Sequence, residues 1–111
     1  MAATMKSLRI KTGSCKRLLK ELQAYEKEVE RETAKTGRMK DDGADPHDLK
    51  QQESVLAESK MMIPDCTKRL EVALGDLQAI LEEAEAESAH GSEEIEEAKK
   101  LVSEVEARID H

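Results

Sequence analysis

The residues best suited to chemistry in this 111-residue sequence are three histidines, two cysteines and a cluster of aspartates. His47, His90 and His111 fall in the first turn of a predicted helix, in a predicted linker and at the end of the sequence. None of these places would shield a catalytic base from water, and the sequence contains no glycine-rich phosphate loop. No set of residues supports catalysis, so we expect a protein that is not an enzyme and uses no cofactor.

The aspartates and cysteines do not form a metal site either. Four aspartates that lie close in the sequence superficially suggest a calcium loop: Asp41, Asp42, Asp45 and Asp48. They lack the ligand order and the final glutamate of an EF-hand, and Pro46 interrupts them, so helix capping explains them better. Cys15 and Cys66 are 51 positions apart without a CxxC motif. We expect two small buried residues in a reducing compartment rather than a disulfide or a zinc site.

The composition indicates long helices rather than sheets. Charged residues make up 39% and hydrophobic residues 38% of the sequence, whereas ordinary globular chains have roughly 25% and 45–50%. Tyr25 is the single aromatic residue, so the side chains that usually fill β-sandwich and barrel cores are missing. The predicted class is all-α.

Charge and hydropathy exclude several kinds of partner. The net charge of -7 and the lack of aromatic platforms argue against nucleic acid. No apolar run approaches the ~20 residues that span a bilayer, and the N-terminal segment lacks the apolar stretch of a signal peptide. We therefore expect a cytoplasmic protein that binds neither nucleic acids nor membranes.

Two breaks divide the sequence into three predicted helices, at about residues 5–41, 46–87 and 92–109. At the first break, Gly43 suits a helix C-cap, Asp45 an N-cap and Pro46 the first helical position. At the second break, Gly91 ends regular structure and Ser92 caps the next helix. The start of the first helix is the least defined boundary, because residues 10–13 include poor helix formers and Ser14 is an alternative N-cap.

Each predicted helix carries a seam, which is a line of mostly apolar or small residues spaced alternately three and four apart. The first seam is Leu8, Lys11, Cys15, Leu18, Leu22, Tyr25, Val29, Glu32, Thr36 and Met39. The second is Leu49, Gln52, Leu56, Ser59, Ile63, Cys66, Leu70, Ala73, Leu77, Ile80 and Ala84. The third is Ile95, Ala98, Val102, Val105 and Ile109. Because short connections make consecutive helices antiparallel, the predicted fold is an elongated, spectrin-like, up-down-up three-helix bundle forming one domain over residues 1–111.

The third predicted helix is much shorter than the other two. At 1.5 Å per residue the first two span roughly 55–60 Å, whereas the third covers only about 27 Å. Half of the hairpin formed by the first two helices would therefore lack a third layer and expose apolar residues: Val29, Met39, Leu49, Val55, Leu56, Met61, Met62 and Ile63. Such a surface is typical of a protein-binding protein, although a second copy of the chain would also cover it.

Pro64 directly follows three apolar residues in the second seam. It removes one backbone hydrogen bond and clashes with the carbonyl of Lys60, so the second helix is predicted to kink or split near Pro64. Two interpretations have equal weight. The bend is purely structural, or it shapes a partner-binding surface formed by Met61, Met62, Ile63 and Pro64.

Basic residues are segregated on the first predicted helix. Six of them fall within a wedge of about 60°, nearly opposite the seam, in a helical projection at ~100° per residue. This basic stripe consists of Arg9, Lys16, Lys20, Lys27, Arg31 and Arg38. Solvated helix faces normally interleave both charges, so a stripe of one sign predicts an acidic partner. Residues 82–111 instead carry eleven acids and three bases, and we interpret these acids as solubilising the third helix.

Several short segments carry a recognisable pattern: Ile10–Gly13, Lys16–Leu18, Lys20–Glu21, Tyr25–Glu28, Glu58–Ser59, Met61–Cys66 and Arg69–Glu71. Together they closely resemble the tubulin-binding cofactor A family, also called tubulin-specific chaperone A. The resemblance covers about residues 8–82, and the turn at Gly43–Pro46 is similar to the plant branch of the family. The remaining C-terminal residues match only in being acidic and helical.

The resemblance implies a three-helix, cytoskeleton-associated chaperone without nucleotide or metal. It would capture β-tubulin released from the cytosolic chaperonin and pass it towards cofactor D for assembly with α-tubulin. On this interpretation Lys16, Lys20, Lys27, Arg31 and Arg38 attract the acidic tubulin surface. A monomer is favoured. The alternative is a coiled-coil adaptor or homodimer in which the polar seam residues Glu32, Gln52 and Ser59 fix the register.

Overall fold

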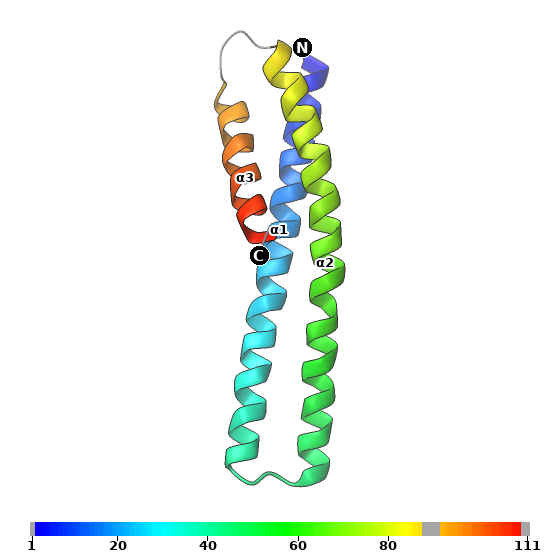
Figure 1. Ribbon diagram of the computed structural model, residues 1–111, viewed down its shortest axis with the longest axis vertical. Coiled ribbons are helices and arrows are strands. Elements are labelled where there is room, and N and C mark those ends of the chain that lie inside the picture. The colour runs from blue at the N-terminus through cyan, green and yellow to red at the C-terminus, as the bar shows by residue number, and fades with distance from the viewer. Residues whose placement is uncertain (1, 88–91, 110–111) are drawn as a thin grey trace. The chain divides into compact units, whose positions relative to one another are not determined.

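The computed structural model describes residues 2–87 and 92–109, which form three α-helices and no strand (Figure 1). Helix α1 spans Ala2–Asp41, α2 spans Pro46–Glu87 and α3 spans Glu93–Ile109. The predicted all-α class is confirmed. Helix α1 begins before residue 5 and continues unbroken through Ser14, which is therefore not an N-cap. The neighbouring side chains of Leu8 and Cys15 are fully buried, and this packing offsets the low helix propensity of residues 10–13.

The turn between α1 and α2 has the predicted capping residues. Gly43 has a φ of 68°, a left-handed conformation that favours glycine. The Gly43 N–H donates to the Lys40 carbonyl at 3.2 Å and the Ala44 N–H to the Met39 carbonyl at 2.9 Å, which is the Schellman arrangement of a helix C-terminus. Asp45 then caps α2, because its carboxylate accepts the N–H of His47 at 3.1 Å.

Ser92 caps helix α3 as predicted. Its hydroxyl oxygen accepts the N–H of Ile95 at 3.1 Å, and its carbonyl accepts the N–H of Glu96 at 3.0 Å. Glu93, Glu94 and Glu96 lie in the first turn, where negative charge interacts favourably with the helix dipole. The predicted helix exit at Gly91 lies outside the described residues, as do His90 and His111.

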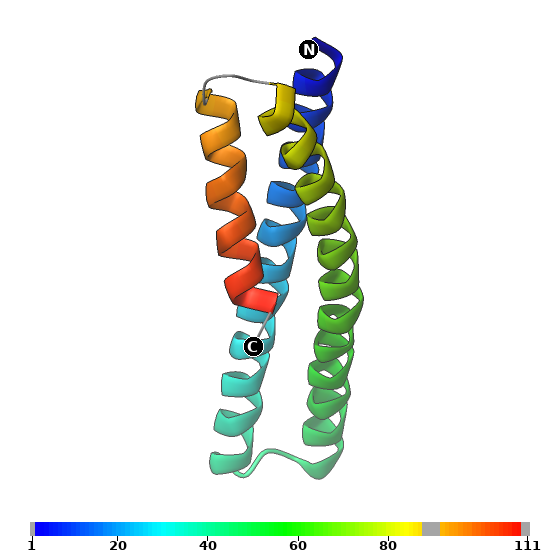
Figure 2. The ribbon, with the colours of Figure 1, turned by 45° about the horizontal axis from the view of Figure 1, so that its top comes forward.

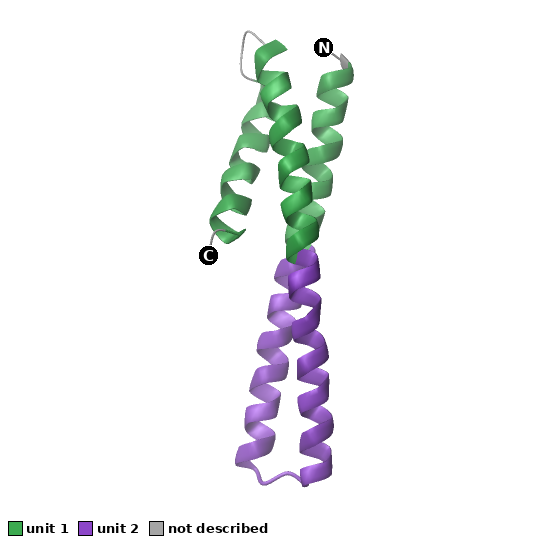
Figure 3. Cartoon of the chain, turned by 45° about the vertical axis from the view of Figure 1, so that its right-hand side comes forward, with its two compact units in different colours: residues 1–20, 67–111 green, residues 21–66 purple. Residues whose placement is uncertain are grey.

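The described part of the chain divides into two compact units (Figure 3). Unit 1 comprises residues 1–20 and 67–111, and unit 2 comprises residues 21–66. Helices α1 and α2 each contribute a segment to both units, whereas α3 belongs to unit 1 alone.

Unit 1 is an up-down-up arrangement of three helical segments, as Figures 1 and 2 show. Its first two segments are antiparallel, since the Thr4 hydroxyl donates to Glu87 at 2.8 Å while Lys11 lies 3.8 Å from Asp76. The third segment is antiparallel to the second, where Lys99 pairs with Glu85 at 3.0 Å and Gln78 donates to Glu106 at 3.5 Å. These contacts establish the bundle topology within this unit.

The core of unit 1 is wider than a single seam. Its buried hydrophobic side chains are Leu8, Cys15, Leu19, Leu70, Leu77, Leu81, Ala84, Ile95, Ala98, Leu101 and Val105. Leu19, Leu81 and Leu101 lie outside the predicted seams, while Val102 is only half-buried. In a three-helix unit each helix faces two neighbours, so the buried arc includes residues on both sides of a seam. Val102 belongs to the predicted third seam, but the buried residue at this point of α3 is Leu101.

Unit 2 is a hairpin of two helical segments with a small core (Figure 3). Its four buried side chains are Leu22, Thr36, Gln52 and Cys66, and two of these are polar. Thr36 donates to the carbonyl of Glu32 at 2.8 Å, and Gln52 donates to the carboxylate of Glu32 at 2.6 Å. Glu32 and Gln52, two of the polar seam residues, therefore satisfy each other within a single chain.

Helix α2 remains one continuous helix through Pro64. The predicted split into two helices is therefore wrong, while a kink at Pro64 stays a prediction. The proline ring is exposed, and the surrounding turns are kept helical by buried residues such as Cys66 and Leu70.

Candidate functional site

The described residues contain no group of three or more His, Cys, Asp or Glu side chains that could hold a metal ion. Nor does any helix within residues 2–87 and 92–109 have the length and apolarity needed to cross a membrane. Cys15 and Cys66 are buried and are not joined in a disulfide, as predicted, and burial raises the pKa of the Cys15 thiol. A candidate site must therefore be sought on the surface, among the charged and apolar side chains.

Part of the basic stripe lies in unit 1, where helix α3 pairs with it. Arg9 contacts Glu94 at 2.6 Å and Lys16 contacts Glu97 at 3.3 Å. The acids of α3 are thus not merely solubilising, because two of them neutralise bases on α1. Lys16 was expected to face a partner protein, but its ammonium group already pairs with Glu97 of the same chain. Lys20 is exposed and forms no ion pair within the described part of the chain.

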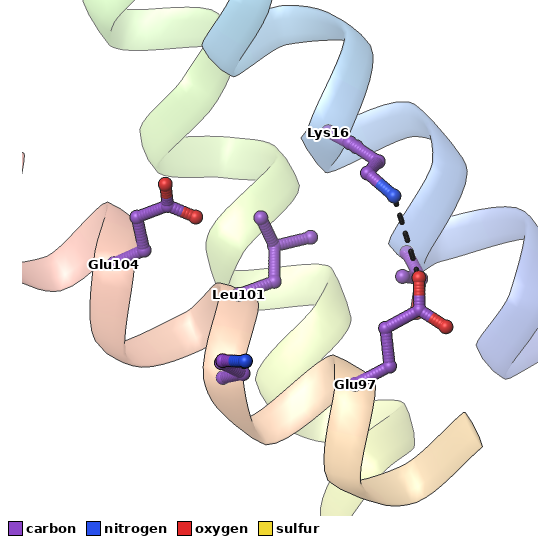
Figure 4. A pocket seen from close by; sticks show the side chains of 6 residues that line it. Lys16, Glu97, Leu101 and Glu104 are labelled. Carbon is purple, nitrogen blue, oxygen red and sulfur yellow. Dashed lines mark hydrogen bonds and ion pairs between the residues drawn. The ribbon is translucent and has the colours of Figure 1, made fainter. Parts of the chain in front are cut away.

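Between α1 and α3 of unit 1 lies a small groove of about 150 Å³. It is lined by Thr12, Lys16, Glu97, Lys100, Leu101 and Glu104, and Figure 4 shows Lys16 and Glu97 pointing toward each other. The hydroxyl oxygen of Thr12 is buried and has no hydrogen-bond partner among the described residues. Two basic and two acidic side chains balance each other here, so the groove has no preference for a charged ligand.

A further ion pair couples α3 to α2. Glu85 lies 3.0 Å from Lys99, and its hydrogen bond and charge, with the charge of Glu96, raise the pKa of Lys99. Both side chains are largely exposed, so this pair orients α3 more than it stabilises the fold. Acidic α3 residues and their basic partners in unit 1 therefore have structural roles.

The rest of the basic stripe lies in unit 2. Lys27, Arg31 and Arg38 are exposed, and none forms an ion pair within the described residues. Each lies opposite the half of α1 that carries the buried Leu22 and Thr36. This part of the stripe, which we call the unit 2 basic face, is available to an acidic partner.

Met61, Met62 and Ile63 were expected to contribute to an apolar partner surface, and they differ in how far they are exposed. Consecutive helical residues point about 100° apart. Met61 is 73% exposed, Met62 is 44% exposed and Ile63 is half-buried, in keeping with three different directions. Pro64 is also exposed, and it lies three residues after Met61, on the same side of α2. A role of these four residues in partner binding stays a prediction.

A different surface was missed by the sequence analysis. Unit 2 contains an open groove of about 410 Å³ between α1 and α2, lined by Lys35, Met39, Asp48, Gln51, Gln52 and Val55. We call it the Val55 groove. Val55 is 42% exposed and Met39 is half-buried. Val55 and Met39 were assigned to the uncovered half of the hairpin, but only the pairing of the two helices shows that they share a groove.

Comparisons with known proteins agree with this architecture. The sequence profile of the family described as "Tubulin binding cofactor A" matches residues 3–102. A tubulin-folding cofactor A from Arabidopsis thaliana is 64% identical over 107 residues, which cover 96% of this chain and 95% of the relative. The crystal structure of tubulin folding cofactor A from Arabidopsis thaliana matches with a TM-score of 0.91 and 63% identity, covering 96% and 99% of the two chains.

A more distant structure extends the comparison. The structure titled "RBL2P, beta-tubulin binding post-chaperonin cofactor" matches with a TM-score of 0.80 and 28% identity over 94% of this chain and 98% of that one. The family is one of tubulin chaperone cofactors rather than enzymes. The three-helix fold, the profile match and the plant relative agree, and they show that this chain belongs to the tubulin binding cofactor A family.

Proposed function

We propose that this protein is a tubulin-folding chaperone that captures β-tubulin released from the cytosolic chaperonin. Its family membership supports a role with tubulin, and the related RBL2P structure is titled as β-tubulin binding. The observation in this chain that carries the proposal is the unit 2 basic face, where Lys27, Arg31 and Arg38 are exposed and pair with no acid that the structure describes. An acidic partner surface would gain attraction and a faster encounter rate from this face.

The captured β-tubulin subunit would pass towards cofactor D for assembly with α-tubulin. This hand-over would take place in the cytoplasm, in association with the cytoskeleton. The protein would act by binding alone, as a monomer without catalysis or cofactor. The hydrogen bond between Glu32 and Gln52 supports the monomer, because two of the three polar side chains that could set the register of a dimer pair with each other within one chain.

The test is a binding titration with radiolabelled β-tubulin released from the chaperonin in a translation reaction. Complex formation with the purified chain is followed on native gels at several salt concentrations, with labelled α-tubulin as the comparison. We expect a complex with β-tubulin and none with α-tubulin. A variant with Lys27, Arg31 and Arg38 changed to Glu should bind more slowly and with a flatter salt dependence, because exposed charges act over about 8–10 Å at physiological ionic strength.

A matched control uses bases that already have partners. Changing Arg9 and Lys16 to Gln removes two ion pairs with α3 and should lower stability by at most about 1 kcal/mol per pair. β-Tubulin capture by this variant should match the parent. If the variant with Lys27, Arg31 and Arg38 changed to Glu captures β-tubulin as well as the parent does, the basic face has no role in binding. A parent chain that binds no β-tubulin would refute the proposed function itself. If light scattering gives the parent chain a molecular mass twice that of a monomer, the homodimer alternative is favoured.

A further inference from the structure

We propose that the Val55 groove of unit 2 is the docking site for an amphipathic helix of the partner, with acidic residues along the flank that meets α1. This inference rests on the proposed capture of β-tubulin and specifies the chemistry of the captured segment. Three features of the groove support it: an apolar floor, walls formed by two helices, and rims of opposite charge.

The floor of the groove offers apolar surface to a partner. Met39 and Val55 line it from opposite helices. Met62 is 44% exposed and lies seven residues after Val55, so two helical turns place it on the same side of α2. A partner that covered these side chains would remove them from water in a unit whose own core buries only two apolar side chains, Leu22 and Cys66.

The walls of the groove suit a helix. Unit 2 consists of two antiparallel helical segments, whereas in unit 1 a third helix covers the equivalent pair. In unit 1 this third helix buries four side chains and places Glu94 and Glu97 on bases of α1. A partner helix would cover unit 2 as α3 covers unit 1, with its apolar residues towards the groove and its acidic residues towards α1.

The two rims carry opposite charge. Lys35 lines the α1 side, next to Arg31 and Arg38 on the neighbouring turns, and none of the three has an ion pair within the described residues. Asp48 lines the α2 side, and Glu58 continues that flank seven residues beyond Gln51. A helix with acids on one flank and basic or polar residues on the other is therefore oriented by both rims.

The first experiment compares two identical substitutions. Val55→Asp places a charge in the groove, and Val72→Asp places the same charge on unit 1 at a valine that is 67% exposed. We expect Val55→Asp to weaken capture of labelled β-tubulin at least tenfold and Val72→Asp to bind within twofold of the parent. Circular dichroism should show parent-like helix content for both, since neither valine is buried.

The outcomes separate the groove from the function on which it rests. A parent chain that captures no β-tubulin refutes the proposed function. A parent chain that captures it, together with a Val55→Asp variant of equal affinity, refutes the groove alone. Two charge-reversal variants give an independent measurement. Lys35→Glu should weaken capture of β-tubulin severalfold, whereas Lys68→Glu on unit 1 should not weaken it. Equal affinity of these two variants would refute the oriented basic rim.

The second experiment identifies the occupant. Val55→Cys can be labelled selectively with benzophenone maleimide in native buffer, because Cys15 and Cys66 are buried. After irradiation in the complex, we expect a crosslink to a β-tubulin helix that has acids along one flank, mapped by mass spectrometry. A label at Val72→Cys should give no such crosslink. A crosslink from Val55→Cys to a second copy of this chain, or to a non-helical β-tubulin segment, would overturn the proposal.

Discussion

The side-chain amide of Gln52 donates a 2.6 Å hydrogen bond to the carboxylate of Glu32, which joins the two helices of unit 2 at the centre of its seam. Gln52 is only 6% exposed. Neither residue suits an apolar core alone, but each satisfies the other. This pair accounts for two of the polar positions that interrupt the seams.

Changing one member of this pair should therefore cost more than changing both. Gln52→Leu leaves the half-buried Glu32 carboxylate without its donor and should lower the free energy of unfolding by about 1–3 kcal/mol. The double change to Leu at both positions should be neutral or stabilising. Urea denaturation measures the free energy of unfolding of the parent, of both single variants and of the double variant. A Gln52→Leu variant as stable as the parent would show that the hydrogen bond has no structural role.

The attachment of α3 should depend on Val105 more than on Val102. Val105 is fully buried and Val102 is half-buried, so Val105→Asp places an unpaired charge in the core and should lower stability by at least about 3 kcal/mol. Val102→Asp can turn its carboxylate to water and should cost clearly less. Thermal unfolding followed by circular dichroism tests the order. The reverse order would mean that α3 packs in a different rotation.

Stability should fall in alkaline solution. Burial raises the pKa of Cys15 above its ordinary value of 9.0 in the folded state. Its contribution to stability is therefore fully present below that value and is lost as the pH rises through the folded pKa. Cys15→Ala removes this titration, so its urea midpoint should depend less on pH between 8 and 11 than that of the parent. Parallel curves for the two proteins would contradict the prediction.

Lys99 contributes in a higher pH range. Its hydrogen bond to Glu85 raises the pKa of the ammonium group above its ordinary value of 10.5, so this contribution is also lost at alkaline pH. Lys99→Gln serves as a control for the Cys15 measurement, because it removes the second titration without changing the first.

The two thiols report separately on the two units. Cys15 belongs to unit 1 and Cys66 to unit 2, and both are buried. Unit 2 buries only four side chains, so in native buffer we expect Cys66 to react with an alkylating reagent faster than Cys15 through local opening. Near the urea midpoint the alkylation rates of Cys15 and Cys66 should converge, because a single domain, as predicted, unfolds as a whole. Rates that stay apart throughout the transition would show two domains that unfold independently.

Replacing Pro64 should raise stability. Pro64→Ala restores a backbone N–H inside the continuous helix α2, and an interior proline costs up to about 3 kcal/mol relative to alanine. If Pro64 shapes the tubulin-binding surface, capture of labelled β-tubulin by this variant should weaken despite its greater stability. Higher stability with unchanged capture would leave Pro64 a structural bend.

Much of the local structure follows from the sequence alone. Gly43, Asp45, Pro46 and Ser92 define helix ends because capping depends on backbone conformation and on side chains within a few residues. The all-α class follows from composition, and the seams follow from periodicity, because both are properties of a single helix. The resemblance of segments such as Met61–Cys66 to a known family required no structure either.

Tertiary structure decided which side chains are buried and which remain free. The burial of Leu19, Leu81 and Leu101 depends on a second neighbouring helix, which no single-helix pattern records. The pairing of Lys16 with Glu97 joins residues 81 positions apart and neutralises part of the basic stripe, although both side chains stay exposed. The Val55 groove likewise exists only between two helices, because Met39 and Val55 belong to different helices and meet through the packing of the hairpin. Sequence therefore determined the elements, while packing between elements selected the surface available to a partner.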